Sequence, residues 1–446
     1  MPDDIFHPDF KAAPYWWEAA APDPLDGEGP PERSDVVVVG GGFAGLNAAL
    51  ELARRGTAVT VLEAGRFGEG ASTRNAGHVS SGSNLGKAPS AAQASPAVRL
   101  LGEARYRALL AEAAGSYEHI ETLIEREAIE CDWRVKGRFV GALTPAHFRA
   151  LAAKSAGQAG VRLVEPEAQH QEIASDFYHG GIVVEKSGQL QPALYHQGLM
   201  AACRRHGVTL VANCPATAIG REAGGFAVET PRGRIRAGGV FLGTNGYSGR
   251  LKPWLRRRII PLGSYIIATE PLGERAAALI PTGRTINDTK RVLSYFRLSP
   301  DGTRLLFGGR ESFSPIDERG SARLLHRTML RVFPQLEGVR VTHSWTGNVA
   351  FSFDFLPHIG TVDGLHYAVG CNGSGVAMMS YLGYRAALTM AGGNERSAFE
   401  GLEHPGRWFY RETPWFMPLV GRYYQFRDAW DRRLAGSGVA RRRNSS

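Results

Sequence analysis

Residues 35–63 read Asp35-Val-Val-Val-Val-Gly-Gly-Gly-Phe-Ala-Gly-Leu-Asn-Ala-Ala-Leu-Glu-Leu-Ala-Arg-Arg-Gly-Thr-Ala-Val-Thr-Val-Leu-Glu63. The β-branched run 36–39 is typical of a parallel strand buried on both faces. A glycine turn follows, and the apolar pattern then predicts a helix over about 44–55 that ends at Gly56, with a second strand over 58–62. This order of elements predicts a βαβ unit.

Three glycines of the turn, Gly40, Gly42 and Gly45, have the G-x-G-x-x-G spacing. In this pattern the first glycine permits the tight turn, the second lets the backbone approach a pyrophosphate, and the third lets the helix pack close to the strand. The free N–H groups at the start of the helix would face the phosphates. Glu63 ends the second strand, where a carboxylate accepts hydrogen bonds from ribose hydroxyls. The stretch therefore predicts dinucleotide binding.

Length and composition restrict the class of protein. A chain of 446 residues is long enough for two or three domains. It has no run of about 18 apolar residues for a membrane-spanning helix, and its N-terminus lacks the pattern of a signal peptide. Its 4 cysteines stand at wide spacings without a C-x-x-C, which argues against a disulfide framework and a zinc site. We therefore expect a cytoplasmic protein with no transmembrane segment and no bound metal.

The formal net charge of +9 would favour anionic partners. The basic residues are dispersed, however, apart from the short runs 256–258 and 441–443. No aromatic and basic module of an RNA reader and no helix-turn-helix pattern is present. We expect solvated surface charge and no nucleic-acid partner.

Other segments suggest how the chain surrounds its ligand. Trp16 and Trp17 are predicted to dock on the body of the protein, since two exposed indoles would form a costly apolar patch. Residues 68–80 are too polar and glycine-rich for a core element and are interpreted as a loop beside a ligand. From residue 259 the sequence predicts β-strands, over 264–269, 292–298 and 304–308.

Three glycine-rich turns lie far apart in the sequence, at 40–45, 243–246 and 370–375. An extended cofactor whose two ends are met by different segments requires such an arrangement. An isolated Rossmann domain that uses NAD does not need the third turn.

These turns and their order make the chain resemble the FAD-dependent D-amino-acid oxidase superfamily. Within that superfamily it most resembles the γ-glutamylputrescine oxidase and glycine-sarcosine oxidase-like branch. The resemblance covers roughly residues 10–430. The blocks that carry it are 35–63, 70–78, 261–271, 287–310, 345–360 and 370–376. The amine-oxidising branch is indicated chiefly by the aromatic N-terminal segment and the aromatic tail.

The resemblance implies an α/β fold with two domains: a Rossmann-like FAD-binding domain around a parallel sheet, and a substrate domain with a mainly antiparallel sheet over the flavin. The implied division is an N-terminal arm (1–34), a discontinuous FAD-binding domain (35–95, 150–260 and 340–395), a substrate-binding domain (96–149 and 261–339) and a C-terminal tail that packs on the body (396–446).

The resemblance also implies which residues bind FAD. The first turn would hold the pyrophosphate and the adenosine ribose, and the loop after it would lie at the flavin phosphate side or the ring edge. The segment near residue 217 would lie beside the adenine. The third turn would hold the flavin pyrimidine, where its N–H groups and the helix dipole would face the developing negative charge. The implied FAD-binding residues are Gly40, Gly42, Phe43, Ala44, Gly45, Glu63, Ala64, Ser72, Thr73, Arg74, Asn75, Ala76, Gly77, His78, Thr217, Ala218, Thr244, Asn245, Gly246, Gly373, Ser374, Gly375, Val376 and Ala377. Ala76 and Ser374 depart from the pattern of many relatives, which have glycine and histidine there.

Five residues are candidates for the reaction itself. His78 follows the flavin loop and would face the ring, or else has a packing role. Arg310 resembles the cation that relatives place over the flavin, with a salt-bridged structural arginine as the alternative. Tyr265, Tyr295 and Arg297 lie on predicted strands, where Tyr295 and Arg297 share one face, and an ordinary sheet face is the alternative for each.

The implied reaction oxidises the C–N bond of a small-molecule amine to an imine, which water hydrolyses. The first hypothesis is an oxidase that acts on γ-glutamylputrescine or a similar amine and reduces O₂ to H₂O₂. The second is a D-amino-acid or sarcosine-type enzyme, either an oxidase or a dehydrogenase that passes electrons to a quinone. The third is an FAD-fold protein without oxidase activity. The sequence leaves the oligomeric state open.

Overall fold

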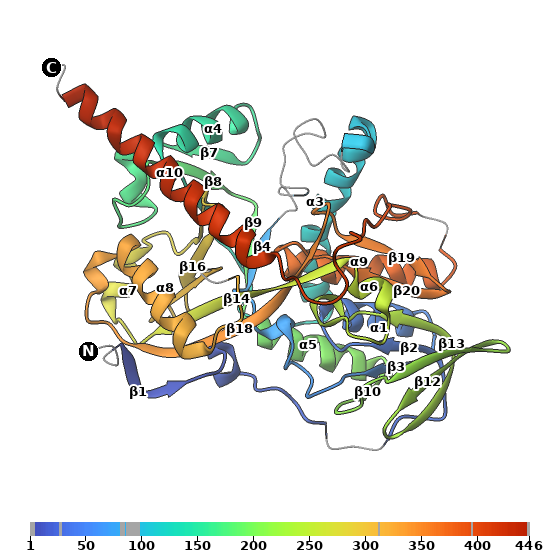
Figure 1. Ribbon diagram of the computed structural model, residues 1–446. Coiled ribbons are helices and arrows are strands. Elements are labelled where there is room, and N and C mark those ends of the chain that lie inside the picture. Colours follow the sequence, from blue (N-terminus) through green and yellow to red (C-terminus); the bar gives the residue numbers. More distant parts are fainter. Residues whose placement is uncertain are drawn as a thin grey trace.

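The computed structural model describes residues 5–25, 29–80, 85, 99–310, 313–393 and 396–443. The predicted βαβ unit is formed by β2 (Arg33–Val39), α1 (Phe43–Arg54) and β3 (Val59–Leu62), and it lies in the blue part of Figure 1. Strand β2 pairs with β3 in parallel, with Val39 opposite Leu62. The strand residues Val37, Val38 and Val61 are fully buried, as expected of a strand covered on both faces.

Around this unit the described residues form an eight-stranded sheet in the order β10-β3-β2-β13-β12-β11, to which β20 adds beside β13 and β19 beside β20. Strands β10, β3, β2, β13 and β20 are parallel to one another, whereas β12 pairs antiparallel with β13 and β19 antiparallel with β20. The helices α1, α5 and α9 pack with this sheet in one apolar core. The further elements are β10 (Thr209–Val211), β11 (Ala218–Glu222), β12 (Gly225–Thr230), β13 (Gly233–Leu242), β19 (His358–Val362), β20 (Leu365–Val369), α5 (Pro192–Arg205) and α9 (Gly375–Met390).

A second sheet, nine-stranded within the described ranges, has the order β1-β18-β14-β17-β16-β15-β6-β8-β7. Most of its pairs are antiparallel, and β1 with β18 and β6 with β15 are parallel. The strands are β1 (Phe6–Lys11), β6 (Arg138–Gly141), β7 (Val161–Val164), β8 (Gly181–Val184), β14 (Ile259–Thr269), β15 (Thr285–Asp288), β16 (Ser294–Leu298), β17 (Leu305–Gly309) and β18 (Val341–Ser352). The two predicted sheets and the mixed α/β fold class are therefore confirmed.

The two faces of this second sheet differ in what covers them. Helix α8 (Glu318–Val332) packs on one face, where Phe139, Ile286, Phe296 and Phe307 form a core with its apolar side chains. The opposite face carries Ile266, Leu306 and Trp345 under the N-terminal Trp16. The pleat of each strand thus separates the apolar core under α8 from the opposite face, which lies toward the N-terminal arm.

The sheets place some strands differently from the division that the resemblance implies. Strands β7 and β8 lie within the segment 150–260 expected in the FAD-binding domain, but β8 pairs with β6 and β7 pairs with β8, so both belong to the second sheet. Strands β1 and β18, from the expected arm and from 340–395, also belong to that sheet. The local sequence pattern predicts a strand but not the sheet that the strand joins, so it cannot show where the chain crosses between the two sheets. The division into domains stays a prediction.

A small third sheet joins β4 (His78–Ser80), β9 (Ser187–Gln189) and β5 (Arg134–Val135). The segment 187–189 pairs with both β4 and β5 and so forms the central strand of this sheet. Other helices are α3 (Glu103–Arg126), α4 (Pro145–Ser155), α6 (Pro253–Arg256), α7 (Glu274–Leu279) and α10 (Met417–Arg443).

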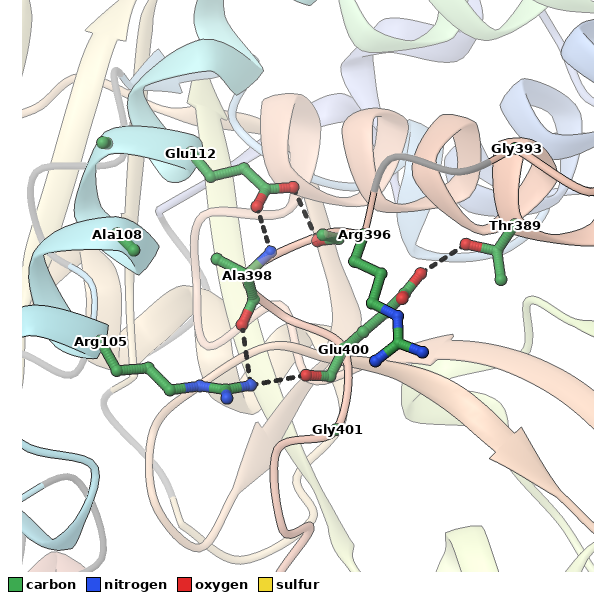
Figure 2. Close-up of a pocket in the computed structure, with 11 residues that line it drawn as sticks. Arg105, Ala108, Glu112, Thr389, Gly393, Arg396, Ala398, Glu400 and Gly401 are labelled. Carbon is green, nitrogen blue, oxygen red and sulfur yellow. Dashed lines mark hydrogen bonds between the residues drawn. The ribbon is translucent and has the colours of Figure 1, made fainter.

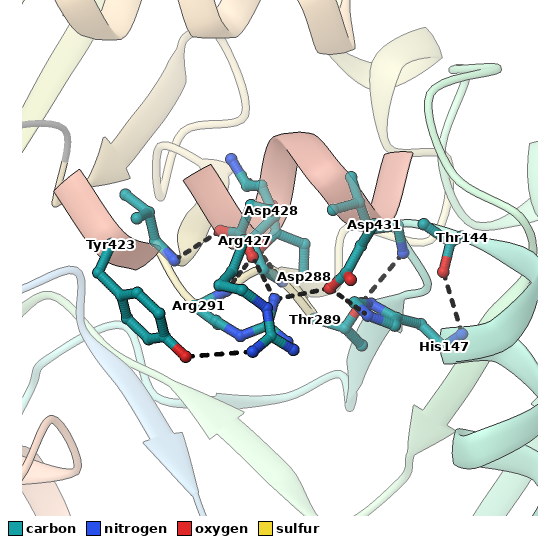
Figure 3. A network of polar contacts seen from close by, with 12 residues as sticks. Thr144, His147, Asp288, Thr289, Arg291, Tyr423, Arg427, Asp428 and Asp431 are labelled. Carbon is teal, nitrogen blue, oxygen red and sulfur yellow. Dashed lines mark hydrogen bonds and ion pairs between the residues drawn. The ribbon is translucent and has the colours of Figure 1, made fainter. Parts of the chain in front are cut away.

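The long helix α10, red in Figure 1, crosses the molecule beside the second sheet. Asp428 accepts hydrogen bonds from the backbone N–H groups of Arg291 (3.2 Å) and Val292 (3.0 Å), between β15 and β16. The Arg291 guanidinium also pairs with Asp428 and with Asp431, and His147 lies 3.7 Å from Asp431 (Figure 3). These contacts attach α10 to the loop that precedes β16. Among the described helices none is both long and apolar enough to span a membrane.

Candidate active site

The first glycine turn has the close contacts that its spacing predicts. Gly40 has φ +103°, a conformation that favours glycine, and a Cβ built on Gly45 would stand 1.9 Å from the Gly40 carbonyl oxygen. The Glu63 carboxylate accepts a hydrogen bond from the Gly41 N–H at 2.8 Å. Burial raises the pKa of Glu63, and backbone N–H groups oppose this shift. The acid at the end of β3 therefore lies directly beside the turn, with Ala64 next to it.

The loop after β3 reaches the start of α1. The Ser72 hydroxyl accepts a hydrogen bond from the Phe43 N–H at 3.0 Å, and a Cβ on Gly42 would stand 2.9 Å from the same hydroxyl oxygen. Ser72, Gly42, Phe43 and Ala44 thus surround the helix N-terminus, the place where the backbone can receive an anion.

The N-terminal arm fixes this loop, as the tryptophan pair predicted. Trp16 is 1% exposed, and its indole N–H donates to the Asn75 carbonyl at 2.8 Å. Trp17 donates to the Thr73 hydroxyl at 2.9 Å. The Arg74 guanidinium lies over the Trp17 ring and donates to the Thr346 carbonyl. Thr73, Arg74 and Asn75 are therefore occupied with holding the loop to the arm and to β18.

The second turn connects to the third. Asn245 accepts a hydrogen bond from the Gly370 N–H through its side-chain oxygen at 3.0 Å, and a Cβ on Gly246 would stand 3.0 Å from the Asn348 carbonyl oxygen. The neighbouring Thr244 hydroxyl bonds to Ser248. Thr217 and Ala218 are exposed at the start of β11, a few residues after Cys214, whose N–H donates to the Glu63 carbonyl.

The third turn opens α9, with Ser374 at the N-cap position and Gly375, Val376 and Ala377 in the first turn. Gly373 has φ +96°, and a Cβ there would stand 3.2 Å from a terminal nitrogen of Arg310. A Cβ on Gly383 of α9 would stand 2.1 Å from the Ala44 carbonyl oxygen, so α9 and α1 meet backbone to backbone. The first turn of α1 therefore meets the middle of α9, and Arg310 lies beside the glycine turn that opens α9.

Tyr295 and Arg310 extend this region onto the second sheet. The Tyr295 ring lies across Gly308, where a Cβ would stand 2.2 Å from the ring, and its hydroxyl bonds to the Ser264 hydroxyl at 2.7 Å. The Arg310 guanidinium lies over the Phe351 ring at 4.4 Å, and its buried Nε has no hydrogen-bond partner in the described chain. Burial lowers the pKa of Arg310, and the nearby Tyr295 opposes this shift.

Tyr265, a third candidate, lies on the opposite face. It packs with the core under α8, and its hydroxyl lies 3.4 Å from the Ser314 carbonyl. Because successive side chains of a strand alternate between faces, the residue after Ser264 points away from Tyr295. The structure therefore does not bring Tyr265 together with the other candidates.

Arg297 shares the face of Tyr295, as expected, but its guanidinium binds backbone. It is 1% exposed and donates to the Leu190 carbonyl at 2.9 Å and, through Nε, to the Leu298 carbonyl at 3.0 Å. Burial lowers its pKa to about 9, so it remains charged at neutral pH. Arg297 thus ties the β9–α5 connection to the second sheet, in place of the substrate contact that was considered for it.

His78 lies at the centre of these groups. Its ring meets the Tyr295 ring edge-on at 6.1 Å between centroids. Burial lowers its pKa well below the usual value, and the positive charges of Arg297 and Arg138 add to this shift. The imidazole is therefore neutral at pH 7 and can accept a proton. Ala76 and Gly77 precede it, and Gly77 has φ +69° with Leu190 against it.

Sequence reasoning missed further polar residues on this face: Arg138, Gln189, Thr285 and Asn287. Each is on a strand, and strand alternation places Thr285 and Asn287 on one face. Local sequence could have given that signal, but only the pairing of β6, β15 and β16 brings these residues beside Tyr295.

A separate surface pocket of about 1270 Å³ lies between α3 and the segment after α9 (Figure 2). Its polar groups bind one another: Arg105 donates to the Glu400 carbonyl at 2.7 Å, and Glu112 accepts from the Ser397 hydroxyl at 2.6 Å. None of the residues that line it is among the candidates of the sequence analysis.

The histidine that supports the first turn predicts a pH dependence of stability. His196 of α5 is 2% exposed, and its Nε2 lies 2.7 Å from the Gly41 carbonyl oxygen. Burial lowers its pKa to about 4, below the value of about 6.5 in an unfolded chain. Between these values the unfolded chain binds the extra proton, so this contribution to stability is lost as the pH falls below 6.5, by about 1.4 kcal/mol per pH unit.

We expect His196→Gln to unfold with a flatter pH dependence than the wild type between pH 7 and pH 5, measured as the denaturation midpoint at each pH. His119 acts in the same direction, because burial lowers its pKa to about 4 as well. The exposed His170 provides the matched variant, His170→Gln. Equal slopes for wild type and His196→Gln would contradict the expectation.

Comparison with known proteins identifies the enzyme family of the chain. The family described as DAO, FAD dependent oxidoreductase, matches residues 35–388, and the chain belongs to this family. It is therefore an FAD-dependent oxidoreductase, of a family related to amine and amino-acid oxidases, whose donors carry a CH–NH group.

The chain is similar to individual proteins of the γ-glutamylputrescine oxidase and glycine oxidase branch. The chain is 34% identical over 413 residues to the probable oxidoreductase OrdL of Haemophilus influenzae, covering 90% of this chain and 93% of the relative. It is 33% identical over 407 residues to the gamma-glutamylputrescine oxidoreductase of Escherichia coli, covering 88% and 92%. The crystal structure of glycine oxidase from Geobacillus kaustophilus has the same fold, with a TM-score of 0.69, 22% identity and coverage of 84% of this chain and 100% of that chain.

Proposed function

We propose that this protein oxidises the C–N bond of a γ-glutamylputrescine-like amine. In the overall reaction R-CH₂-NH₂ with O₂ and H₂O gives R-CHO, NH₃ and H₂O₂, through an imine that water hydrolyses. The similarity to a gamma-glutamylputrescine oxidoreductase supports the substrate class. The observation that carries the proposal is the contact of neutral His78 with Tyr295 and the nearby Arg310, which lies at the third glycine turn and whose Nε has no hydrogen-bond partner among the described residues.

The residues present fit FAD. The first turn leaves no room for side chains at Gly45, and Glu63 lies beside it as an acceptor for ribose hydroxyls. Residues 72–77 and the start of α9 would hold the flavin phosphate side and ring, with Thr217 near the adenine. When bound, FAD accepts the two electrons and the hydrogen that leave the amine carbon.

The chain's own residues would prepare the amine. The burial that lowers the pKa of His78 would also lower the pKa of a bound alkylammonium, and so favour the neutral amine that is oxidised. His78, neutral and with a free ring nitrogen, is placed to accept a hydrogen bond from the N–H of the neutral amine. Tyr295, held by Ser264, would position the amine against the third turn.

The test is the visible spectrum of the purified holoenzyme under anaerobic conditions with γ-glutamylputrescine, putrescine, sarcosine or D-alanine. We expect γ-glutamylputrescine to bleach the flavin absorbance, and air to restore it with formation of H₂O₂. Bleaching by sarcosine or D-alanine alone would contradict the substrate class. A reduced enzyme that air does not reoxidise, but a quinone does, would contradict the oxidase assignment. The cytoplasmic location expected from the sequence stays a prediction.

A further inference from the structure

Arg138, the first residue of β6, is a buried cation without a protein partner. It is 6% exposed and makes no ion pair or hydrogen bond to any residue that the structure describes, and its Nε is buried without a partner. Burial lowers its pKa to about 10, so it is charged at neutral pH. An unpaired charge in the interior is strongly unfavourable unless something else compensates it.

The neighbours of Arg138 also carry buried polar atoms that have no partner among the described residues. Thr285, its partner across β15, is fully buried with a free hydroxyl, and the buried side-chain oxygen of Gln189 accepts no hydrogen bond within the described residues. The His78 Nε2 and the Asn287 oxygen lack hydrogen bonds of normal geometry, although Asn287 is close enough to His78 to oppose part of its pKa shift.

Register places Arg138, Thr285, Asn287 and Tyr295 on one face of the second sheet, and it pairs Gln189 with His78 in the third sheet. Arg138 pairs with Thr285, Asn287 pairs with Tyr295, and Gln189 pairs with His78. Native interiors leave few polar groups unpaired, and here five of them gather beside the residues proposed to handle the amine. Arg297, on the same face, differs from Arg138, because the Arg297 guanidinium donates hydrogen bonds to backbone carbonyls.

The spacing of the strands suggests the shape of the ligand. From β6 to β16, which carries Tyr295, there are two strand spacings, or roughly 10 Å. In an α-amino acid the carboxylate and the nitrogen share one carbon, too short a separation to span this face. An amine with its carboxylate several bonds away has the required length.

We propose that Arg138 binds the carboxylate of an extended amine substrate, whose amine end lies at His78 and Tyr295, with Thr285 and Gln189 completing the polar lining. This rests on the proposed function, which it deepens by assigning the residue that recognises the acidic end. A buried guanidinium that meets a carboxylate forms strong, paired hydrogen bonds.

The kinetic test compares γ-glutamylputrescine with N-acetylputrescine, which has the same amine end and no carboxylate. We expect Arg138→Met to raise KM for γ-glutamylputrescine about 30-fold, with kcat within about 3-fold and KM for N-acetylputrescine within about 2-fold. Arg138→Lys should recover part of the loss. Arg134→Met removes an exposed arginine from the neighbouring β5 and should match wild type. Equal effects of Arg138→Met on both substrates would overturn the proposal.

A binding test does not depend on turnover. Glutarate offers a carboxylate and no amine, and it should shift the flavin spectrum or raise the unfolding temperature of the wild-type holoenzyme but not of Arg138→Met. If no amine bleaches the flavin while glutarate still discriminates the two proteins, the proposed function fails and the anion site stands. If glutarate affects both proteins alike, or neither, while the amine is oxidised, the anion site is overturned.

Discussion

Replacing Gly45 with alanine should yield a protein that retains less than about a tenth of the wild-type FAD. The new Cβ would stand 1.9 Å from the Gly40 carbonyl oxygen, and that atom belongs to backbone, which cannot swing aside as a side chain does. The helix α1 would have to move away from β2, which disturbs the turn and the N–H groups that face the pyrophosphate. The measurement is the ratio of flavin absorbance to protein absorbance after purification.

Gly220→Ala is the matched control, because a Cβ there meets nothing within 4 Å and the residue lies on β11 of the same sheet. It should retain FAD as the wild type does. Normal flavin content in Gly45→Ala would mean that the close contact between α1 and the turn is not needed for binding.

Arg297→Met should destabilise the protein by about 3 kcal/mol, because it leaves the buried Leu190 carbonyl without its donor and removes the bond to the Leu298 carbonyl. Both are charge-assisted hydrogen bonds in the interior, where an unpaired carbonyl is costly. Urea denaturation of the holoenzyme, followed by far-UV circular dichroism, gives the change in midpoint.

The same variant separates two roles for this arginine. A guanidinium that binds only backbone should leave KM for the amine within about 3-fold in the folded fraction, whereas loss of a carboxylate contact would raise it about tenfold or more. Unchanged stability together with a strongly raised KM would mean that Arg297 binds the substrate and not only the backbone carbonyls. Arg297→Lys should recover only part of the stability, since one ammonium cannot reproduce the fork of the guanidinium.

The confirmed predictions depend on short-range pattern. The order of strand, glycines, helix and acid in residues 35–63 determined the βαβ unit, and Glu63 lies at the turn because β3 runs parallel beside β2. The aromatic pair of the N-terminal arm was expected to dock, and Trp16 is buried against the loop at Asn75.

The tertiary structure decided which polar residues meet. Alternation along β16 showed that Tyr295 and Arg297 share a face, but it could not show that Tyr265 faces the core under α8 or that Arg297 binds carbonyls. Arg138 and Thr285 are far apart in the chain, and they are neighbours only because β6 pairs with β15. The sequence alone thus determined the βαβ unit and dinucleotide binding, because these follow from local spacing, while FAD and the two-sheet fold were implied by the family resemblance. The composition of the substrate face was decided by strand pairing and register, which depend on contacts between distant segments.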